Sequence, residues 1–218
     1  MKTETKMLGI GMTERNVPKV MSGAKTQTRR TINPQPIPIE GNMLNESKHF
    51  GLSLGNQVWE WNGGKGTISC KDDLMQFLLD NARHQIGDRL YVKEALQKHY
   101  VEHNGDYAMY KTDRAMLEPL REWARDTGEP WKQNVIPARY MPRSAARTFI
   151  EITDVKCERI QSISVDDAIA EGITKEQWEP HGAVKAFKEL WDDTNGKDAW
   201  ERNNWVLAYT FKLAEAPQ

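Results

Sequence analysis

Basic side chains gather in two stretches of the chain that contain no acidic residue. One runs from Arg15 to Arg30 and the other from Lys132 to Arg147. Lysine and arginine attract phosphate and other anions, and the arginine guanidinium binds them with two parallel hydrogen bonds. Residues 151–218, in contrast, hold 14 acidic and 8 basic side chains. The two stretches therefore predict either an anion-binding site or a solvated surface paired with the acidic C-terminal third.

Motifs for several other kinds of chemistry are missing from the sequence. The five histidines have no cysteine partner, and Cys70 and Cys157 lack metal-ligand spacing. The glycines of residues 62–66 lack the spacing of a phosphate-binding loop. We therefore expect no metal and no cofactor.

The composition is that of an ordinary globular protein. The chain has 218 residues, of which 39% are hydrophobic and 28% charged, and its net charge is −1. This balance excludes a histone-like basic protein and an acidic disordered tail. No apolar run reaches the roughly 20 residues of a membrane span, and the N-terminus lacks a secretory signal. We therefore expect a cytoplasmic protein that does not bind membranes.

Periodicity predicts many strands with scattered short helices. Alternating or β-branched residues predict strands at 7–12, 90–95, 144–160 and 204–214, and a hairpin at 102–110. Helical spacing predicts helices within 13–23, over 72–83, near 117–125, and around 184–191. A further helix over 165–171 is expected between Ser164, a capping residue, and Gly172. This pattern favours a small β-barrel decorated with helices over a doubly wound fold.

Five segments in a fixed order carry a family resemblance. They are GAKTQTRRTINPQP (23–36), IGDRLYVKEA (86–95), YMPRSAARTFIEITDVKCERIQSISVDDAIAEGI (140–173), FKELWDDTNG (187–196) with a later Trp at 200, and NNWVLAYTF (203–211). Together they resemble an ASCH-domain protein of the PUA-like superfamily, of the longer kind common in phages and prophages. The resemblance implies an α+β fold, a PUA-like small β-barrel with short helices. It also implies one domain over residues 1–218, with insertions at about 33–85 and 101–135. Asn204 departs from the proline that is common before the Trp-Val pair.

The resemblance also implies a set of site residues. The motif G-x-K-x-x-T-x-R of a bacterial N4-acetylcytidine amidohydrolase is similar to the run from Gly23 to Arg30. It gives catalytic roles to Lys25 and Thr28, and a later glutamate of the family matches Glu171. The residues expected to bind substrate are Arg29, Arg30, Tyr91 and Arg143.

The chemistry of amide hydrolysis fits these residue types. A threonine hydroxyl attacks a carbonyl only when a base takes its proton, and a lysine can be that base when burial or nearby cations lower its pKa. Lys25 and Thr28 would point to opposite faces of an extended strand, so a turn or bend around Lys25–Thr28 is required, which Gly23 would allow. Glu171 would protonate the leaving amine. The alternative is that Lys25 and the arginines only bind phosphate, Thr28 caps a turn, and Glu171 lies on the surface.

Two classes of function follow. The first is a metal-independent amidohydrolase that removes the acyl group from N4-acylated cytosine nucleosides, with the modified nucleoside as its partner. The second is a PUA-like module that binds RNA or DNA without catalysis, and a weaker third is a phosphodiesterase using the same basic cleft. The near-neutral charge argues mildly against a general nucleic-acid binder.

Overall fold

Strands and short helices follow one another in the computed structural model, which describes residues 7–38, 59–61, 66–68, 71–101, 105–117 and 134–216. The strands are β1 (Leu8–Gly11), β2 (Gln27–Thr31), β3 (Ile37–Pro38), β4 (Trp59–Trp61), β5 (Gly66–Ile68), β6 (Arg89–Lys93), β7 (Leu96–Val101), β8 (Gly105–Tyr110), β9 (Met116–Leu117), β10 (Val135–Ile136), β11 (Phe149–Arg159) and β12 (Trp205–Ala214). The α-helices are α1 (Val17–Met21), α2 (Lys71–Asp80), α4 (Val165–Ala170), α5 (Lys175–Trp178) and α6 (Ala183–Asn195). Short 3-10 turns are η4 (Ala138–Tyr140), η5 (Arg143–Ala145) and η6 (Ile160–Ser162).

Internal contacts divide the chain into two compact units. Unit 1 comprises residues 1–26, 86–153 and 211–218, and unit 2 comprises residues 27–85 and 154–210. Strands β11 and β12 each run from one unit into the other. The expected single domain over residues 1–218 stays a prediction.

Unit 1 contains a parallel strand pair and a small antiparallel sheet. β1 pairs with β6 in parallel, from Leu8 opposite Leu90 to Gly11 opposite Lys93, and β6 also pairs with the first residues of β11. The second sheet has the order β10-β7-β8-β9. Its apolar cluster consists of Leu96, Tyr110, Ile136, Met141 and Ala145.

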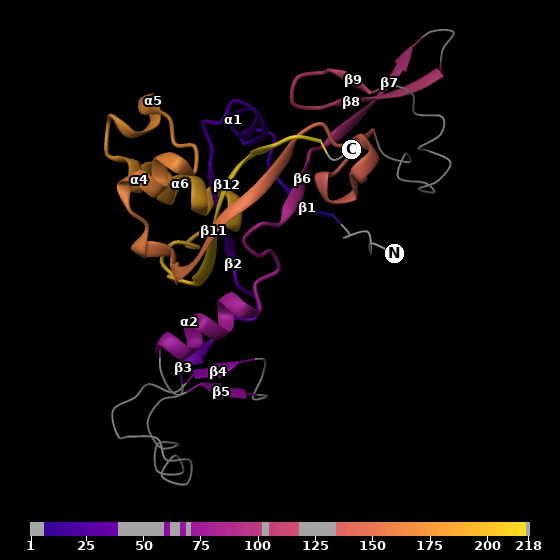
Figure 1. The fold of residues 1–218 in the computed structure, drawn as a ribbon. Coiled ribbons are helices and arrows are strands. Elements are labelled where there is room, and N and C mark those ends of the chain that lie inside the picture. Colours follow the sequence, from indigo (N-terminus) through magenta and orange to yellow (C-terminus); the bar gives the residue numbers. More distant parts are fainter. Residues whose placement is uncertain are drawn as a thin grey trace, which may run out of the picture. The chain divides into compact units, whose positions relative to one another are not determined.

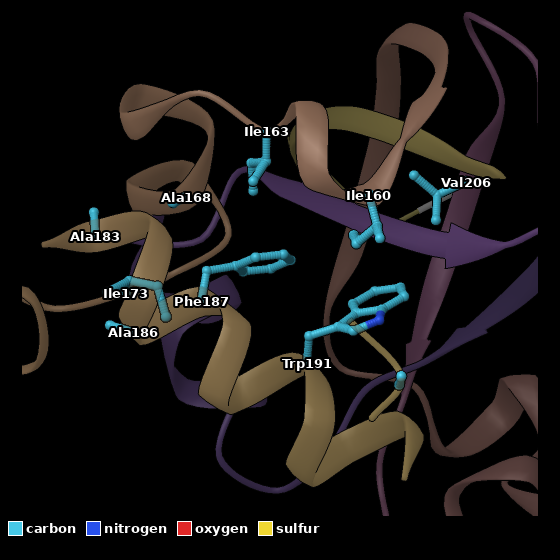
Figure 2. Close-up of a cluster of buried hydrophobic side chains, with 10 residues drawn as sticks. Ile160, Ile163, Ala168, Ile173, Ala183, Ala186, Phe187, Trp191 and Val206 are labelled. Carbon is cyan, nitrogen blue, oxygen red and sulfur yellow. The ribbon is translucent and has the colours of Figure 1, made fainter. Parts of the chain in front are cut away.

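Unit 2 combines the β11-β12-β2 strand order with three helices. β2 runs antiparallel to β12, with Thr28 opposite Tyr209. Helices α4, α5 and α6 lie together beside these strands (Figure 1). Phe187 and Trp191 project from α6 toward Ile160 and Ile163, so the helix closes an apolar core over the strands (Figure 2). The same unit holds the small sheet β3-β4-β5.

Helix α4 forms where local capping signals predict it. The Ser164 side chain accepts a hydrogen bond from the backbone N–H of Asp167 at 3.1 Å. Gly172 follows the helix with φ +92°, a conformation that glycine adopts without strain. Glu171 occupies the C-cap position between these signals.

The α+β class is confirmed. The strand order β1-β6-β11-β12-β2 that the described residues form has two ends, so it is an open sheet and not the closed barrel expected from the sequence. The strand expected from residue 144 begins at Phe149, because residues 143–145 turn as η5 after Pro142. The helix expected near 117–125 lies almost entirely outside the described residues. No helix in the described ranges is long and apolar enough to cross a membrane.

Candidate functional site

The two faces of strand β2 carry different polar side chains. Side chains alternate along a strand, so Gln27 and Arg29 share one face while Thr28 and Arg30 share the other. Gln27, Thr28 and Arg29 are all buried, although a polar side chain lowers stability on burial unless it finds partners. The strand therefore brings polar chemistry into the interior of unit 2.

Arg29 is the centre of a buried ionic group. Its side chain is only 1% exposed. Its Nε and Nη2 lie 2.8 and 2.7 Å from the same Oε1 of Glu158, and its Nη1 donates to Gln27 Oε1 at 2.9 Å. Longer contacts of 3.3 Å reach Asp167 and Glu171. We call Arg29, Gln27, Glu158, Asp167 and Glu171 the Arg29 cluster.

The ring of Phe187 adds an aromatic face to this cluster. The guanidinium carbon of Arg29 lies 5.9 Å from the Phe187 ring centroid, within the range of cation–π attraction. Phe187 belongs to the apolar core shown in Figure 2. The Arg29 guanidinium therefore lies between its carboxylate partners and the Phe187 ring of α6.

Asp167 is held in its ionised form. Burial alone would raise the pKa of the Asp167 carboxyl, but hydrogen bonds from Gln27 and Ser164 and the charge of Arg29 lower it below its usual value. Gln27 Nε2 donates to Asp167 Oδ1 at 2.8 Å. Asp167 thus has strong support besides its long contact with Arg29.

Arg30 lies on the opposite face of β2 and is exposed, in contrast to Arg29. The protein surrounding its guanidinium lowers the pKa of Arg30, and the charges of Glu171 and Tyr209 partly offset that effect. Arginine remains charged across the working pH range even so. Two neighbouring arginines of β2 therefore act on the single carboxyl of Glu171.

Lys25 precedes β2, at a bend. Gly23 has φ +75°, and the Lys25 backbone N–H donates to the Lys19 carbonyl at 2.9 Å. The chain therefore turns ahead of Lys25, and the bend expected around Lys25–Thr28 stays a prediction. Lys25 itself is buried, with an exposed fraction of 2%. Lys25 belongs to unit 1, and Thr28 belongs to unit 2.

The other two expected substrate-binding residues also lie in unit 1. Tyr91 is buried on β6 opposite Gly9, with the Lys93 ammonium 5.5 Å from its ring centroid. A Cβ atom at Gly9 would clash with the Tyr91 ring and the Lys93 side chain, so only glycine fits there. Arg143 lies exposed in η5. That these two residues bind substrate stays a prediction.

A second buried ionic group lies in unit 1, and the sequence did not indicate the acidic partners of its arginine. Arg147 forms a two-pronged pair with Glu94, at 2.8 and 2.7 Å to its two oxygens, and contacts Asp113 at 2.7 Å. Its guanidinium carbon lies 3.7 Å from the Tyr110 ring centroid. Glu94 is completely buried. We call Arg147, Glu94, Asp113 and Tyr110 the Arg147 cluster.

The sequence-predicted residues Arg29, Arg30 and Glu171 come together in unit 2, by direct contact or through charge. Sequence reasoning did not identify Glu158 or Asp167 as partners of Arg29. A buried arginine requires carboxylate partners, but nothing in the local sequence indicates which ones. Among the described residues, no group of His, Cys, Asp and Glu side chains is arranged to hold a metal ion.

In chemical terms, the Arg29 cluster can hold a carboxyl group at the end of a short helix. Its three carboxylates face one buried guanidinium, so carboxylate groups outnumber the cation inside the cluster. A carboxyl group in such surroundings can accept or donate a proton.

No protein-family model and no curated protein matches the sequence. Among solved structures, the chain is similar to the crystal structure of protein EF3133 from Enterococcus faecalis V583, which is described with the family DUF984. The two are 13% identical, the match covers 95% of this chain and 74% of that chain, and the TM-score is 0.37. At this level of overlap, the likeness identifies neither the fold nor the activity of the chain.

Proposed function

We propose that the protein is a metal-independent amidohydrolase that removes the acyl group from N4-acylated cytosine nucleosides, and that its fold is of the PUA-like ASCH kind. The observation that carries the proposal is the burial of all three residues with proposed catalytic roles. Lys25, Thr28 and Glu171 have exposed fractions of 2%, 5% and 4%. Burying polar side chains lowers stability unless they are paired, so such residues are candidates for function.

The proposed reaction begins with Thr28. Lys25, in its neutral form, takes the proton of the Thr28 hydroxyl while Oγ1 attacks the acyl carbon. The chain sets only an upper limit on their separation, because three residues span at most about 11 Å between Cα atoms. A tetrahedral intermediate forms, and its collapse breaks the bond from the acyl carbon to N4.

Glu171 completes the first half by giving a proton to the departing N4 amine. Cytidine leaves, and the acyl group stays on Thr28 as an ester. Water then attacks the ester while Glu171, now ionised, accepts its proton, and Lys25 returns its own proton to Oγ1 of Thr28, so that the carboxylic acid is released and all three residues are restored. Arg30, charged and exposed beside this motif, is the proposed contact for substrate.

Release of cytidine from N4-acetylcytidine, followed by ultraviolet absorbance, tests this function. We expect Lys25→Ala and Thr28→Ala each to lower kcat by at least about 100-fold, the contribution of a general base or nucleophile. Lys19→Ala and Thr31→Ala are matched controls from the same basic stretch and the same strand, and they should stay near the wild-type rate. EDTA should leave the rate unchanged. Near wild-type turnover in either Lys25→Ala or Thr28→Ala would rule out the base–nucleophile pair.

A nucleic-acid-binding module is the second candidate, and one feature of unit 1 favours it. Arg139 and Tyr140 are exposed in η4, with the guanidinium carbon 4.8 Å from the ring centroid. Exposed Arg and Tyr side chains bind phosphates and stack on bases. Salt-dependent binding of single-stranded RNA, lost in Tyr140→Ala and present without any hydrolysis, would favour this function over the enzyme.

A further inference from the structure

The three carboxylates of the Arg29 cluster share its guanidinium unequally. Glu158 receives two short contacts, at 2.7 and 2.8 Å, whereas Glu171 receives one contact of 3.3 Å. Charge-assisted hydrogen bonds in proteins are normally 2.7–2.9 Å long, so the contact to Glu171 is weak in comparison. Arg29 is therefore anchored by Glu158 and reaches Glu171 with a different nitrogen.

The remaining neighbours of Arg29 fix the direction of its side chain. Gln27, two residues earlier on the same face of β2, accepts from the same Nη1 that reaches Glu171. Phe187 from α6 covers the guanidinium at 5.9 Å. Because the guanidinium is planar and rigid, fixing Nε and Nη2 on Glu158 also fixes where Nη1 lies. The position of Nη1 in turn defines where the Glu171 oxygen is held.

Glu171 needs such support because of its place in the chain. It is the C-cap of α4, a helix of six residues followed by Gly172 with a positive φ. A short helix end of this kind does not by itself hold a side chain rigidly. A carboxyl group that transfers a proton must nevertheless lie within hydrogen-bond reach of the leaving nitrogen.

We propose that Arg29 is a positioning residue that acts through Glu171: Glu158, Asp167 and Gln27 hold the guanidinium, and the guanidinium holds the Glu171 carboxyl group where the leaving amine is protonated. This inference rests on the proposed function. It differs from the substrate-binding role that the sequence suggested for Arg29. A side chain that is 1% exposed and in contact with three carboxylates serves the protein interior.

The test compares Arg29→Lys with the wild-type protein on two substrates. Lysine keeps the positive charge but lacks the planar guanidinium with its several donors. Glu171 is therefore displaced, while the net charge of the cluster is unchanged. We expect kcat on N4-acetylcytidine to fall about 10- to 100-fold, the cost of misplacing a reacting group, with KM within about 2-fold. The loss should be smaller on the 5-fluoro analogue, because its amine leaves more readily and needs less protonation.

A double-mutant cycle separates an effect through Glu171 from a general disturbance. If Arg29 acts through Glu171, the double variant Arg29→Lys with Glu171→Gln should be no slower than Glu171→Gln alone. Arg159→Lys is the matched control: it changes another part-buried arginine of unit 2, which stacks on Trp205 at 4.4 Å and donates to the Asn203 carbonyl. Its kcat should stay within about 2-fold of the wild-type value.

Several outcomes would overturn the inference alone. They are equal slowing of both substrates in Arg29→Lys, additive losses in the cycle, or a change confined to KM, each with Lys25→Ala still inactive. A wild-type protein that folds but does not hydrolyse either substrate overturns the proposed function, and the inference with it. Thermal unfolding of each variant shows whether a loss of rate reflects a loss of fold, and Arg29→Gln then gives a second, neutral replacement for comparison.

Discussion

Each of the two compact units contains a largely buried arginine that contacts carboxylates and an aromatic ring, but the two arginines are neutralised differently. In the Arg147 cluster, every ionic contact is 2.7 or 2.8 Å long, and Glu94 meets the guanidinium with both oxygens. In the Arg29 cluster, one oxygen of Glu158 makes two short contacts, whereas Asp167 and Glu171 each lie 3.3 Å from the guanidinium. All ionic contacts of one arginine are short, and the other arginine has both short and long ones.

The contacts of the Arg147 cluster indicate a structural role. Burial alone would lower the pKa of Arg147, but hydrogen bonds to Glu94 and Asp113 raise it above its usual value. The Tyr110 hydroxyl donates to the Ala145 carbonyl at 2.7 Å, so the ring beneath the guanidinium is also fixed. The comparison teaches that a buried ionic group is a candidate for chemistry when its contacts are unequal, and for structure when they are all short.

The largest expected effect comes from removing each arginine. Breaking a buried ion pair costs about 3–5 kcal/mol, because a carboxylate is left buried without a cation. We expect Arg147→Met to lower the free energy of unfolding by this amount, and Arg29→Met to lower it by at least as much, since Glu158 and Asp167 both lose the guanidinium. Urea unfolding at neutral pH measures both. A milder effect at Arg29 than at Arg147 would break the comparison.

A smaller effect is expected when both partners of a pair become apolar. Replacing a whole buried pair by apolar side chains of similar size is often close to neutral. Arg147→Met with Glu94→Leu should therefore recover most of the stability lost in Arg147→Met, because Asp113 is 44% exposed and stays hydrated.

The same exchange in unit 2 sharpens the contrast. Arg29→Met with Glu158→Leu should recover less than half of the loss, since Asp167 keeps its charge without the guanidinium. The denaturation midpoints of the two double variants decide this. Equal recovery in both units would mean that the second and third carboxylates of the Arg29 cluster contribute little.

How far the sequence could predict this difference depends on the range of each signal. Local signals worked well: Ser164 and Gly172 bracket α4, and the alternation in residues 204–214 corresponds to β12. The motif around Lys25 also directed attention to a segment whose polar side chains are buried.

The ionic partners could not be predicted, because they are distant along the chain. Glu158 lies 129 residues from Arg29, and Glu171 lies 142 residues from it. Glu94 and Arg147 are 53 residues apart and have no motif of their own. The local sequence pattern around an acidic residue is the same whether its side chain faces solvent or a buried guanidinium. Only the fold brings β2, β11 and the end of α4 together around Arg29.

The smallest expected effect concerns acid, and it compares Asp167 with Asp113. The pKa of Asp113 is lowered mainly by its hydrogen bond to Arg147, and the pKa of Asp167 is lowered although burial opposes the shift. A carboxyl whose pKa is lower in the folded state binds fewer protons there than in the unfolded chain. Its contribution to stability is therefore complete above about pH 5 and is lost as the pH falls through the folded pKa, below the ordinary value of about 3.9.

Asp167→Asn and Asp113→Asn should each make the fall of the unfolding free energy below about pH 4 less steep, because the substituted residue no longer takes up a proton. At neutral pH the two variants differ in a way that reflects their clusters. Asp113→Asn removes the short ionic contact to Arg147, and the neutral amide provides no equally strong contact in its place. Asp167→Asn relieves one surplus charge, keeps an oxygen for Gln27, and should change the stability by less than about 1 kcal/mol. Urea unfolding between pH 3 and 7 gives both slopes. If the unfolding free energy of Asp167→Asn falls in acid as steeply as that of the wild-type protein, the Arg29 cluster does not hold Asp167 in its ionised form. The number of carboxylates in the cluster then has no effect on stability.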